Sequence, residues 1–180
     1  MKENQEGEKF KLIFPIEEID FLRESNAIES VFDKDSLFQA LHAWQYIKNE
    51  TILSTNKILQ THKTLMLNSS LFADEKGEFR KRPVYVGNKQ RGYFEKLNWE
   101  KIPSAIDNWI VKMNSTIGIK ENLEDLNKDL HVEYEEIHPF IDGNGRTGRI
   151  FMNWWRLRNQ LPVLVIKNEE KQTYYSWFNK

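Results

Sequence analysis

Most of the chain consists of segments in which apolar residues recur every three or four positions, the spacing of one face of an α-helix. Such segments cover residues 16–31, 37–48, 55–67, 99–117, 123–137, 146–159 and 171–179. Ser36 can cap the second segment, and Pro103 lies in the first turn of the fourth, where proline is tolerated. Helices of this kind are stable only when their apolar faces pack together. We therefore predict a mostly α fold, a helical bundle.

Two parts of this pattern allow specific expectations about burial. In the first segment the predicted buried face consists of Ile16, Ile19, Phe21, Leu22 and Ile28. The tryptophans on apolar faces are expected in the core; these are Trp44, Trp154, Trp155 and Trp177. Three histidines without a carboxylate at metal-ligand spacing are interpreted as ordinary helix residues; these are His42, His62 and His131.

Residues 79–94 depart from the helical pattern. They combine short Val/Tyr alternation with a Gly-Asn turn signal, which predicts two strands at about 83–86 and 91–94 that form a small hairpin. The preceding run, Lys76 to Arg82, alternates in charge and is predicted to be a solvated turn.

The bulk properties limit the class of protein. The 180 residues suit one domain, residues 10–180, after a short charged tail at residues 1–9. A formal net charge of −1 indicates no electrostatic attraction to nucleic acid or anionic membranes. With no cysteine, a metal would have to bind oxygen or imidazole. No signal peptide or membrane-spanning stretch is apparent, so we expect a cytoplasmic domain.

The loop at residues 138–149 carries the groups of a phosphate site. Gly143 and Gly145 permit backbone conformations in which successive N–H groups converge, and a predicted helix follows directly. A helix N-terminus adds unsatisfied N–H groups and partial positive charge, which bind phosphate. Arg146 and Arg149 are three residues apart on that helix and can both reach the anion.

Two further side chains extend this site from anion binding to catalysis. Asp142 offers a hard oxygen ligand for Mg²⁺ shared with phosphate. His138 has an ordinary pKa of about 6.5, which suits a general base near neutral pH. Pro139 and Phe140 are expected to stiffen and anchor the loop.

Other interpretations of the loop fit its context less well. A Gly-Asn-Gly turn can be a mere connection. Residues 143–148 also fit the dinucleotide fingerprint, but the preceding residues 133–139 are charged and helical rather than a buried strand. A calcium loop starting at Asp142 would place Thr147 at the required glycine and Asn153 at the required glutamate.

Residues 138–149 resemble the Fic-domain family, whose signature is His-Pro-Phe, any residue, Asp or Glu, Gly-Asn-Gly-Arg, two free positions and Arg. Residues 58–62 resemble the upstream helix of that family, and residues 77–80 with 84–87 resemble its flap. The resemblance spans roughly residues 15–180. It implies a Fic-type helical bundle with a β-hairpin flap. It also implies transfer of AMP from ATP to a Tyr, Ser or Thr hydroxyl of a target protein.

The resemblance assigns roles by position in the loop. It implies that His138 is the catalytic base and that Asp142 is the Mg²⁺ ligand. The matching phosphate-binding residues are Gly143, Asn144, Gly145, Arg146 and Arg149. Among these, Asn144 corresponds to the α-phosphate, Arg146 to the β-phosphate and Arg149 to the γ-phosphate. Doc-like kinases carry Lys in place of the second glycine, so Gly145 favours AMP transfer over phosphorylation.

The segment at residues 25–31 resembles the inhibitory helix of the same family. The spacing of four places Ser25 and Glu29 on one helical face, while Ser30 and Val31 depart from the last two motif positions. The resemblance implies that Glu29 pairs with Arg149 and blocks the γ-phosphate position. We therefore expect an autoinhibited adenylyltransferase.

Several alternatives and partners remain open at this point. The same glutamate could serve de-AMPylation with metal-bound water, the loop could belong to a non-catalytic nucleotide-binding module, or a separate protein could supply the brake. The expected substrates are ATP with Mg²⁺ and a target protein, aligned by strand addition at the flap. Self-modification is a further possibility, and no nucleic acid or membrane partner is expected.

Overall fold

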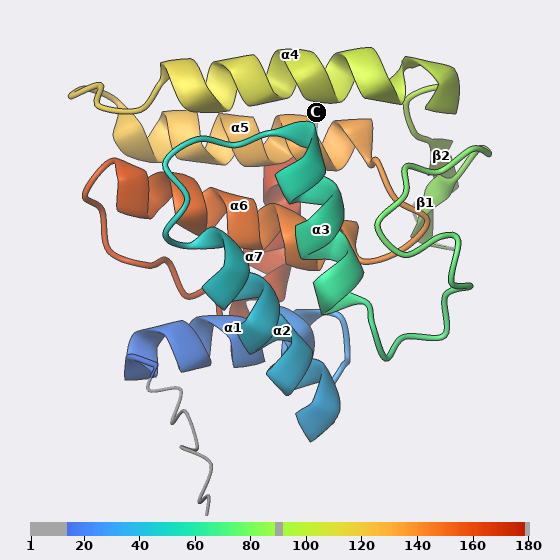
Figure 1. Cartoon of the computed structure of the whole chain (residues 1–180), viewed down its shortest axis with the longest axis horizontal. Helices are drawn as coiled ribbons and strands as arrows, with labels where there is room; N and C mark the ends of the chain where they lie inside the picture. The colour runs from blue at the N-terminus through green and yellow to red at the C-terminus, as the bar shows by residue number, and fades with distance from the viewer. Residues whose placement is uncertain (1–13, 89–91, 179–180) are drawn as a thin grey trace, which may run out of the picture.

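The computed structural model describes residues 14–88 and 92–178. These residues form seven α-helices and one two-stranded antiparallel sheet (Figure 1), which confirms the predicted mostly α bundle with a small hairpin. The helices are α1 (Ile16–Ile28), α2 (Lys34–Ile47), α3 (Thr55–Leu65), α4 (Ile102–Ser115), α5 (Leu123–Ile137), α6 (Asn144–Arg158) and α7 (Lys171–Tyr175). The strands are β1 (Tyr85–Asn88) and β2 (Gly92–Glu95). The predicted tail at residues 1–9 lies outside the described residues.

The bundle is built around α5 and α6. In Figure 1, α4, α5 and α6 lie one above another, and α5 packs against both neighbours. α1 packs on α6 and on α2, while α3 contacts α2, α4 and α6. The hairpin lies to one side, near the connection from α5 to α6 (Figure 1). No helix within the described ranges is both long enough and apolar enough to cross a membrane.

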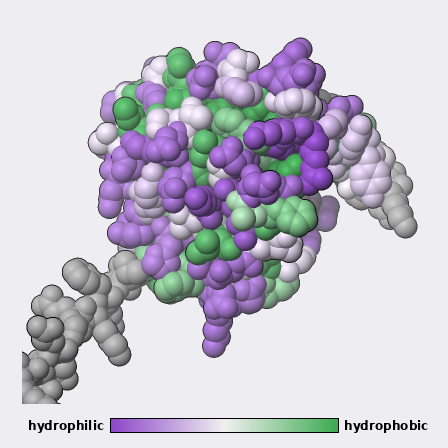
Figure 2. Space-filling model, turned by 45° about the vertical axis from the view of Figure 1, so that its right-hand side comes forward, coloured by the Kyte–Doolittle hydropathy of each residue, from purple (hydrophilic) through white to green (hydrophobic). Residues whose placement is uncertain are grey.

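Tryptophan side chains fill the centre of the bundle. Trp44, Trp109, Trp154 and Trp155 are fully buried. Buried indole N–H groups need an acceptor, and three of these find one. The indole of Trp109 donates to the Leu130 carbonyl, that of Trp154 to the Glu50 carbonyl and that of Trp155 to the Thr116 hydroxyl. The outer surface differs from this core: the face shown in Figure 2 is largely hydrophilic, with hydrophobic residues in small groups.

A second, smaller core cluster lies between α1, α6 and the C-terminal segment. It contains Ile28, Met152, Ile166 and Tyr174. Trp177, predicted to be in the core, is only half-buried at the edge of this cluster. The cluster fixes the C-terminal segment beside α1 and therefore beside the candidate site described below.

Several predicted boundaries and contacts were wrong by one turn or less. Ile16 is 61% exposed and is the first residue of α1. The cap of α2 is Asp33, whose carboxylate accepts the backbone N–H of Ser36, so the predicted cap residue is the donor of the bond. The strands begin one to two residues later than predicted, with Tyr85 opposite Glu95. α6 begins at Asn144, two residues earlier than predicted.

The connection before α3 depends on one amide side chain of α4. Asn114 accepts the backbone N–H of Leu53 at 2.8 Å and donates to the carbonyl of the same residue at 3.0 Å. Leu53 is buried, so water does not replace these bonds. The pair of bonds fixes the start of α3, which carries His62 to the candidate site.

We expect Asn114→Ala to lower the free energy of unfolding by about 1–3 kcal/mol, because it leaves two backbone groups of a buried residue without partners. Urea denaturation measures the change. Asn108→Ala makes the same truncation at an exposed position of α4 and serves as the control. If both variants lost the same free energy of unfolding, the Asn114 side chain would contribute no more than an exposed asparagine of the same helix.

Candidate active site

Two backbone reversals shape the loop between α5 and α6. His138 ends α5 in the left-handed region, with φ 49°, and Gly143 precedes α6 with φ 77°. Between them, the Asn144 side chain accepts the N–H of Phe140 and donates to its carbonyl, both at 2.9 Å. Phe140 itself is fully buried, as predicted from the sequence. The loop is therefore a fixed turn that holds His138 close to the first turn of α6.

His62 of α3 supports the loop from below. Its ring stacks on Phe140 with centroids 3.7 Å apart, and its Nε2 lies 3.0 Å from the Asp142 carbonyl. The Gly77 backbone N–H donates to its Nδ1 at 2.9 Å. Because a carbonyl can only accept, Nε2 carries the proton and the ring is neutral. His62 is thus a helix residue, as interpreted, and both its ring nitrogens are hydrogen-bonded, which joins α3, the turn at Gly77 and the loop.

Arg80 supports the loop from the side of the hairpin. Its side chain is buried, donating from Nε to the His138 carbonyl at 2.7 Å and from Nη1 to the Arg82 carbonyl at 3.0 Å. The prediction of a solvated turn over this run was therefore wrong at Arg80. A buried guanidinium is stable here because backbone carbonyls around it accept its protons.

His138 faces the cavity between the loop and the hairpin. Burial, followed by the positive charge of Lys96, lowers the pKa of His138 to about 4. The expectation of an ordinary histidine pKa is thus corrected: the imidazole is neutral over a wider pH range but is a weaker base. Its Nδ1 is buried and lies 3.7 Å from a carboxylate oxygen of Glu135. Nε2 is therefore the nitrogen available to a substrate.

Glu135 was not singled out from the sequence. It lies one turn before His138 on α5, and burial raises its pKa to about 7. The i, i+3 spacing to His138 is the signal that could have revealed it.

The first turn of α6 presents backbone N–H groups at the cavity floor, where they have no intrahelical acceptor. Asn144 is buried, and its side-chain amide is hydrogen-bonded to the backbone of Phe140. The backbone N–H of Asn144, and not its side chain, is therefore the group that can bind an anion. Gly145 was expected to adopt a backbone conformation closed to other residues, but it has ordinary helical backbone angles within α6. A Cβ at Gly145 would instead overlap the Glu29 carboxylate and lie 3.0 Å from Arg149 Nη1.

Arg149 is the most enclosed charged group of the site, with an exposure of 1%. Its Nε donates to the Ser25 hydroxyl at 2.9 Å, and its Nη2 donates both to the Ser25 carbonyl at 2.9 Å and to Glu29 Oε1 at 2.8 Å. Its Nη1 donates to the Tyr174 hydroxyl at 3.0 Å. The structure thus brings together three residues singled out from the sequence, Ser25, Glu29 and Arg149, and adds Tyr174, which was not.

Arg146 and Asp142 lie together at the other side of the first turn. Arg146 is buried, with Nη2 3.2 Å from the Met66 sulfur and 3.8 Å from an Asp142 carboxylate oxygen. The Asp142 side chain is 63% exposed, and its other oxygen accepts the Gly143 N–H. One carboxylate oxygen of Asp142 therefore remains open to the cavity.

Several of these groups line one cavity of about 840 Å³, namely Glu29, Glu135, His138, Asp142, Arg146 and Tyr174. Its floor is the loop and the first turn of α6, and one wall is the hairpin, through Tyr85, Val86 and Phe94. The opposite wall comes from Glu29 and from the C-terminal segment. The cavity is large enough for a nucleotide.

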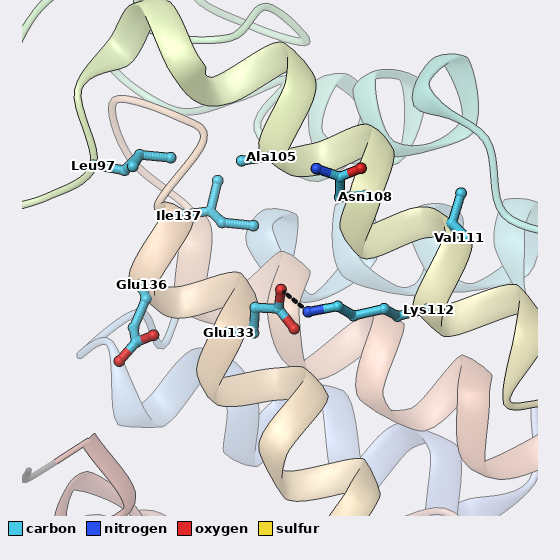
Figure 3. A pocket seen from close by; sticks show the side chains of 8 residues that line it. All are labelled: Leu97, Ala105, Asn108, Val111, Lys112, Glu133, Glu136 and Ile137. Carbon is cyan, nitrogen blue, oxygen red and sulfur yellow. Dashed lines mark hydrogen bonds and ion pairs between the residues drawn. The ribbon is translucent and has the colours of Figure 1, made fainter.

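A second hollow, of about 560 Å³, lies between α4 and α5 (Figure 3). It contains none of the residues of the loop, and the ion pair between Lys112 and Glu133 spans it at 2.6 Å. Its chemistry offers no base or anion-binding group comparable with those of the first cavity.

The donor set of the first cavity suits a magnesium ion that is shared with a ligand. Among residues 14–88 and 92–178, no three His, Asp or Glu side chains converge on one point that could hold a metal. Mg²⁺ in phosphate-transfer sites is commonly bound by one or two carboxylates, water and substrate phosphates. The open oxygen of Asp142 fits this kind of site.

Comparison with known proteins found relatives of this chain. A model described as the Fic/DOC family matches residues 52–155. The protein adenylyltransferase Fic of Nematostella vectensis is 25% identical over 157 residues, which cover 84% of this chain and 35% of that protein. The protein of the same name in Drosophila yakuba is 30% identical over 123 residues, which cover 68% of this chain and 23% of that protein. The chain thus spans about a third or less of these relatives.

Solved structures support the fold. A Fic domain containing signaling protein from Bacteroides thetaiotaomicron superposes with a TM-score of 0.76 at 23% identity, covering 88% of this chain and 69% of that one. A Fic family protein from Desulfovibrio desulfuricans superposes with a TM-score of 0.71 at 22% identity, covering 89% and 55%.

The buried titratable groups of the site predict how stability depends on pH. Burial lowers the pKa of His62 to about 4 and that of His131 to about 3, as it does for His138. The unfolded chain binds these three protons near pH 6.5, so stability falls as the pH drops below that value. Glu135 acts in the opposite direction between pH 7 and 4.5, because its raised pKa lets the folded protein bind a proton.

We therefore expect the free energy of unfolding to fall by up to about 3 kcal/mol per pH unit between pH 6 and 5, which corresponds to a net uptake of two protons on unfolding. Urea denaturation at a series of pH values measures this slope. Glu135→Gln removes the opposing group and should steepen the slope toward three protons. A slope that is flat, or unchanged by Glu135→Gln, would contradict this account of the site.

Proposed function

Because the chain belongs to the Fic/DOC family, we propose that it transfers AMP from ATP to a Tyr, Ser or Thr hydroxyl of a target protein and that Glu29 holds it inactive. The observation that carries the proposal is the ion pair of Glu29 with Arg149, at 2.8 Å. The same site contains a neutral His138 and the start of α6, which has no side-chain cap. The relatives named above are called protein adenylyltransferases, which supports the reaction class.

In the proposed reaction the target hydroxyl oxygen forms a bond to the α-phosphorus. Its proton goes to His138 Nε2, and the bond from the α-phosphorus to the bridging oxygen breaks, so pyrophosphate leaves with that electron pair. The neutral imidazole is available as an acceptor at physiological pH because burial keeps it unprotonated. The hairpin wall would align the target segment by strand addition.

The rest of the cavity would bind and orient the triphosphate. The N–H groups at the start of α6 face the α-phosphate, and Arg146 and Arg149 supply charge to the β- and γ-phosphates. Asp142 would hold Mg²⁺, which when bound neutralises phosphate charge. Such transfer depends mainly on positioning and electrostatic stabilisation, which a rigid buried loop provides.

Glu29 would act as the brake by occupying the place of the γ-phosphate. Its carboxylate lies against Gly145 and is bonded to Arg149, so a third phosphate would meet both an occupied donor and a negative charge. A charge-assisted bond of this kind contributes about 1.5–3 kcal/mol. Since the Glu29 side chain is 35% exposed, we take the lower end, which corresponds to about tenfold inhibition.

We expect Glu29→Gly to incorporate about tenfold more label than the parent when incubated with α-³²P-ATP, Mg²⁺ and a host lysate. His138→Ala in the Glu29→Gly background should incorporate none. Glu17→Gly makes the same substitution at an exposed position of α1 and should match the parent.

Two other outcomes would replace this proposal. If the parent removes AMP from a labelled protein and Glu29→Gly does not, Glu29 serves de-AMPylation. If ATP binds but no variant transfers label, the cavity is a nucleotide-binding module. Equal labelling by the parent and Glu29→Gly would remove Glu29 as the brake.

A further inference from the structure

Tyr174 contacts Arg149 through Nη1, whereas Glu29 contacts it through Nη2. It lies on α7 with an exposure of 3%, within the small core cluster that also holds Ile28 and Met152. Its hydroxyl accepts Arg149 Nη1, and the guanidinium carbon lies 5.3 Å from the centre of its ring. A buried guanidinium is therefore held by both the polar tip and the aromatic face of one side chain.

The hydroxyl of Tyr174 is held in turn by His131 of α5. The Tyr174 oxygen and His131 Nε2 are 2.8 Å apart. An arginine N–H can only donate, so the hydroxyl accepts from Arg149 and its own proton can go to His131 Nε2. Burial, followed by the charge of Arg149, lowers the pKa of His131 to about 3, which keeps that nitrogen free to accept. The three groups form one directed chain from α6 through α7 to α5.

The donors of Arg149 show what this chain accomplishes. Of its five N–H groups, one bonds the Ser25 hydroxyl, one the Ser25 carbonyl, one Tyr174 and one Glu29. Within the described residues, one hydrogen of Nη1 has no acceptor, and loss of Glu29 would free one hydrogen of Nη2. These two hydrogens form a fork that suits two oxygens of a phosphate.

We propose that Tyr174, held by His131, is a positioning residue that keeps the Arg149 fork aimed at the terminal phosphate of a nucleoside triphosphate after Glu29 moves away. The proposal rests on the function proposed above. Glu29 occupies the fork, whereas Tyr174 and Ser25 hold the guanidinium by its other N–H groups. Tyr174 thus contributes to binding a triphosphate in preference to a diphosphate, without touching the nucleotide phosphate itself.

The test measures dissociation constants for ATP and for ADP, each with Mg²⁺, by calorimetry in the Glu29→Gly/His138→Ala background, where neither the brake nor transfer interferes. Adding Tyr174→Phe removes the hydroxyl and keeps the ring. We expect the preference for ATP over ADP to fall by up to about tenfold, because a bond to a charged group is lost. Tyr46→Phe, an exposed tyrosine of α2, is the matched control and should leave the preference unchanged.

A change confined to ATP supports the positioning role, since general loosening of the fold would weaken both nucleotides alike. Equal weakening of ATP and ADP, or no change, overturns it. Arg149→Ala in the same background separates this failure from failure of the proposed function: if that variant also keeps the preference, Arg149 does not bind the γ-phosphate. Should Tyr174→Phe not fold, His131→Leu removes the partner of the hydroxyl and should lower the same preference to a smaller extent, with the same contrary outcomes.

Discussion

The guanidinium of Arg149 is the group on which the arrangement of this structure depends. A fully buried positive charge is tolerated only when its hydrogens are accepted and a negative charge is near. Its acceptors come from α1, through Ser25 and Glu29, and from α7, through Tyr174. The same ion cluster therefore joins three elements far apart in the sequence and closes the first cavity at one end.

The remainder of the site depends on backbone groups that are satisfied by side chains. The loop between α5 and α6 has no regular hydrogen-bond ladder, so each of its buried polar groups needs a separate partner. Asn144 supplies partners within the loop, His62 supplies one from α3, and Arg80 supplies one from the approach to the hairpin. These contacts explain how a turn with two left-handed residues can hold an imidazole in one place.

Local chemistry made much of this predictable from the sequence. Helical spacing identified all the major helices, and α5 (Leu123–Ile137) has the predicted limits because apolar periodicity and the left-handed His138 end coincide there. The pairing of Glu29 with Arg149 followed from the family resemblance and is present in the geometry. The hydrogen bond between Ser25 and Arg149 was not predicted. Helical spacing alone states only that Ser25 and Glu29 share one face of a helix, and the contact with Arg149 came from the resemblance.

Long-range packing decided what the sequence could not predict. Arg80 falls in a run of alternating charge, and only the folded loop surrounds it with carbonyls. The raised pKa of Glu135 and the lowered pKa of His138 both result from burial, and the neighbouring residues in the sequence do not determine how deeply a side chain is buried. Gly145 was expected for its backbone freedom, but the fold requires it for the space that the Glu29 carboxylate occupies.

The position of Glu29 bears on how such a brake can be released. Glu29 follows the last residue of α1, and the next residue, Ser30, has φ 60°, so the carboxylate is carried by the end of the helix and not by its middle. Ser25, one turn earlier, is buried and bonded to Arg149 through both its hydroxyl and its carbonyl. Rotation of the Glu29 side chain breaks one hydrogen bond, whereas removal of α1 from α6 would break three and expose the buried charge. The contacts therefore favour release by side-chain rotation, with α1 remaining docked as part of the arginine's support.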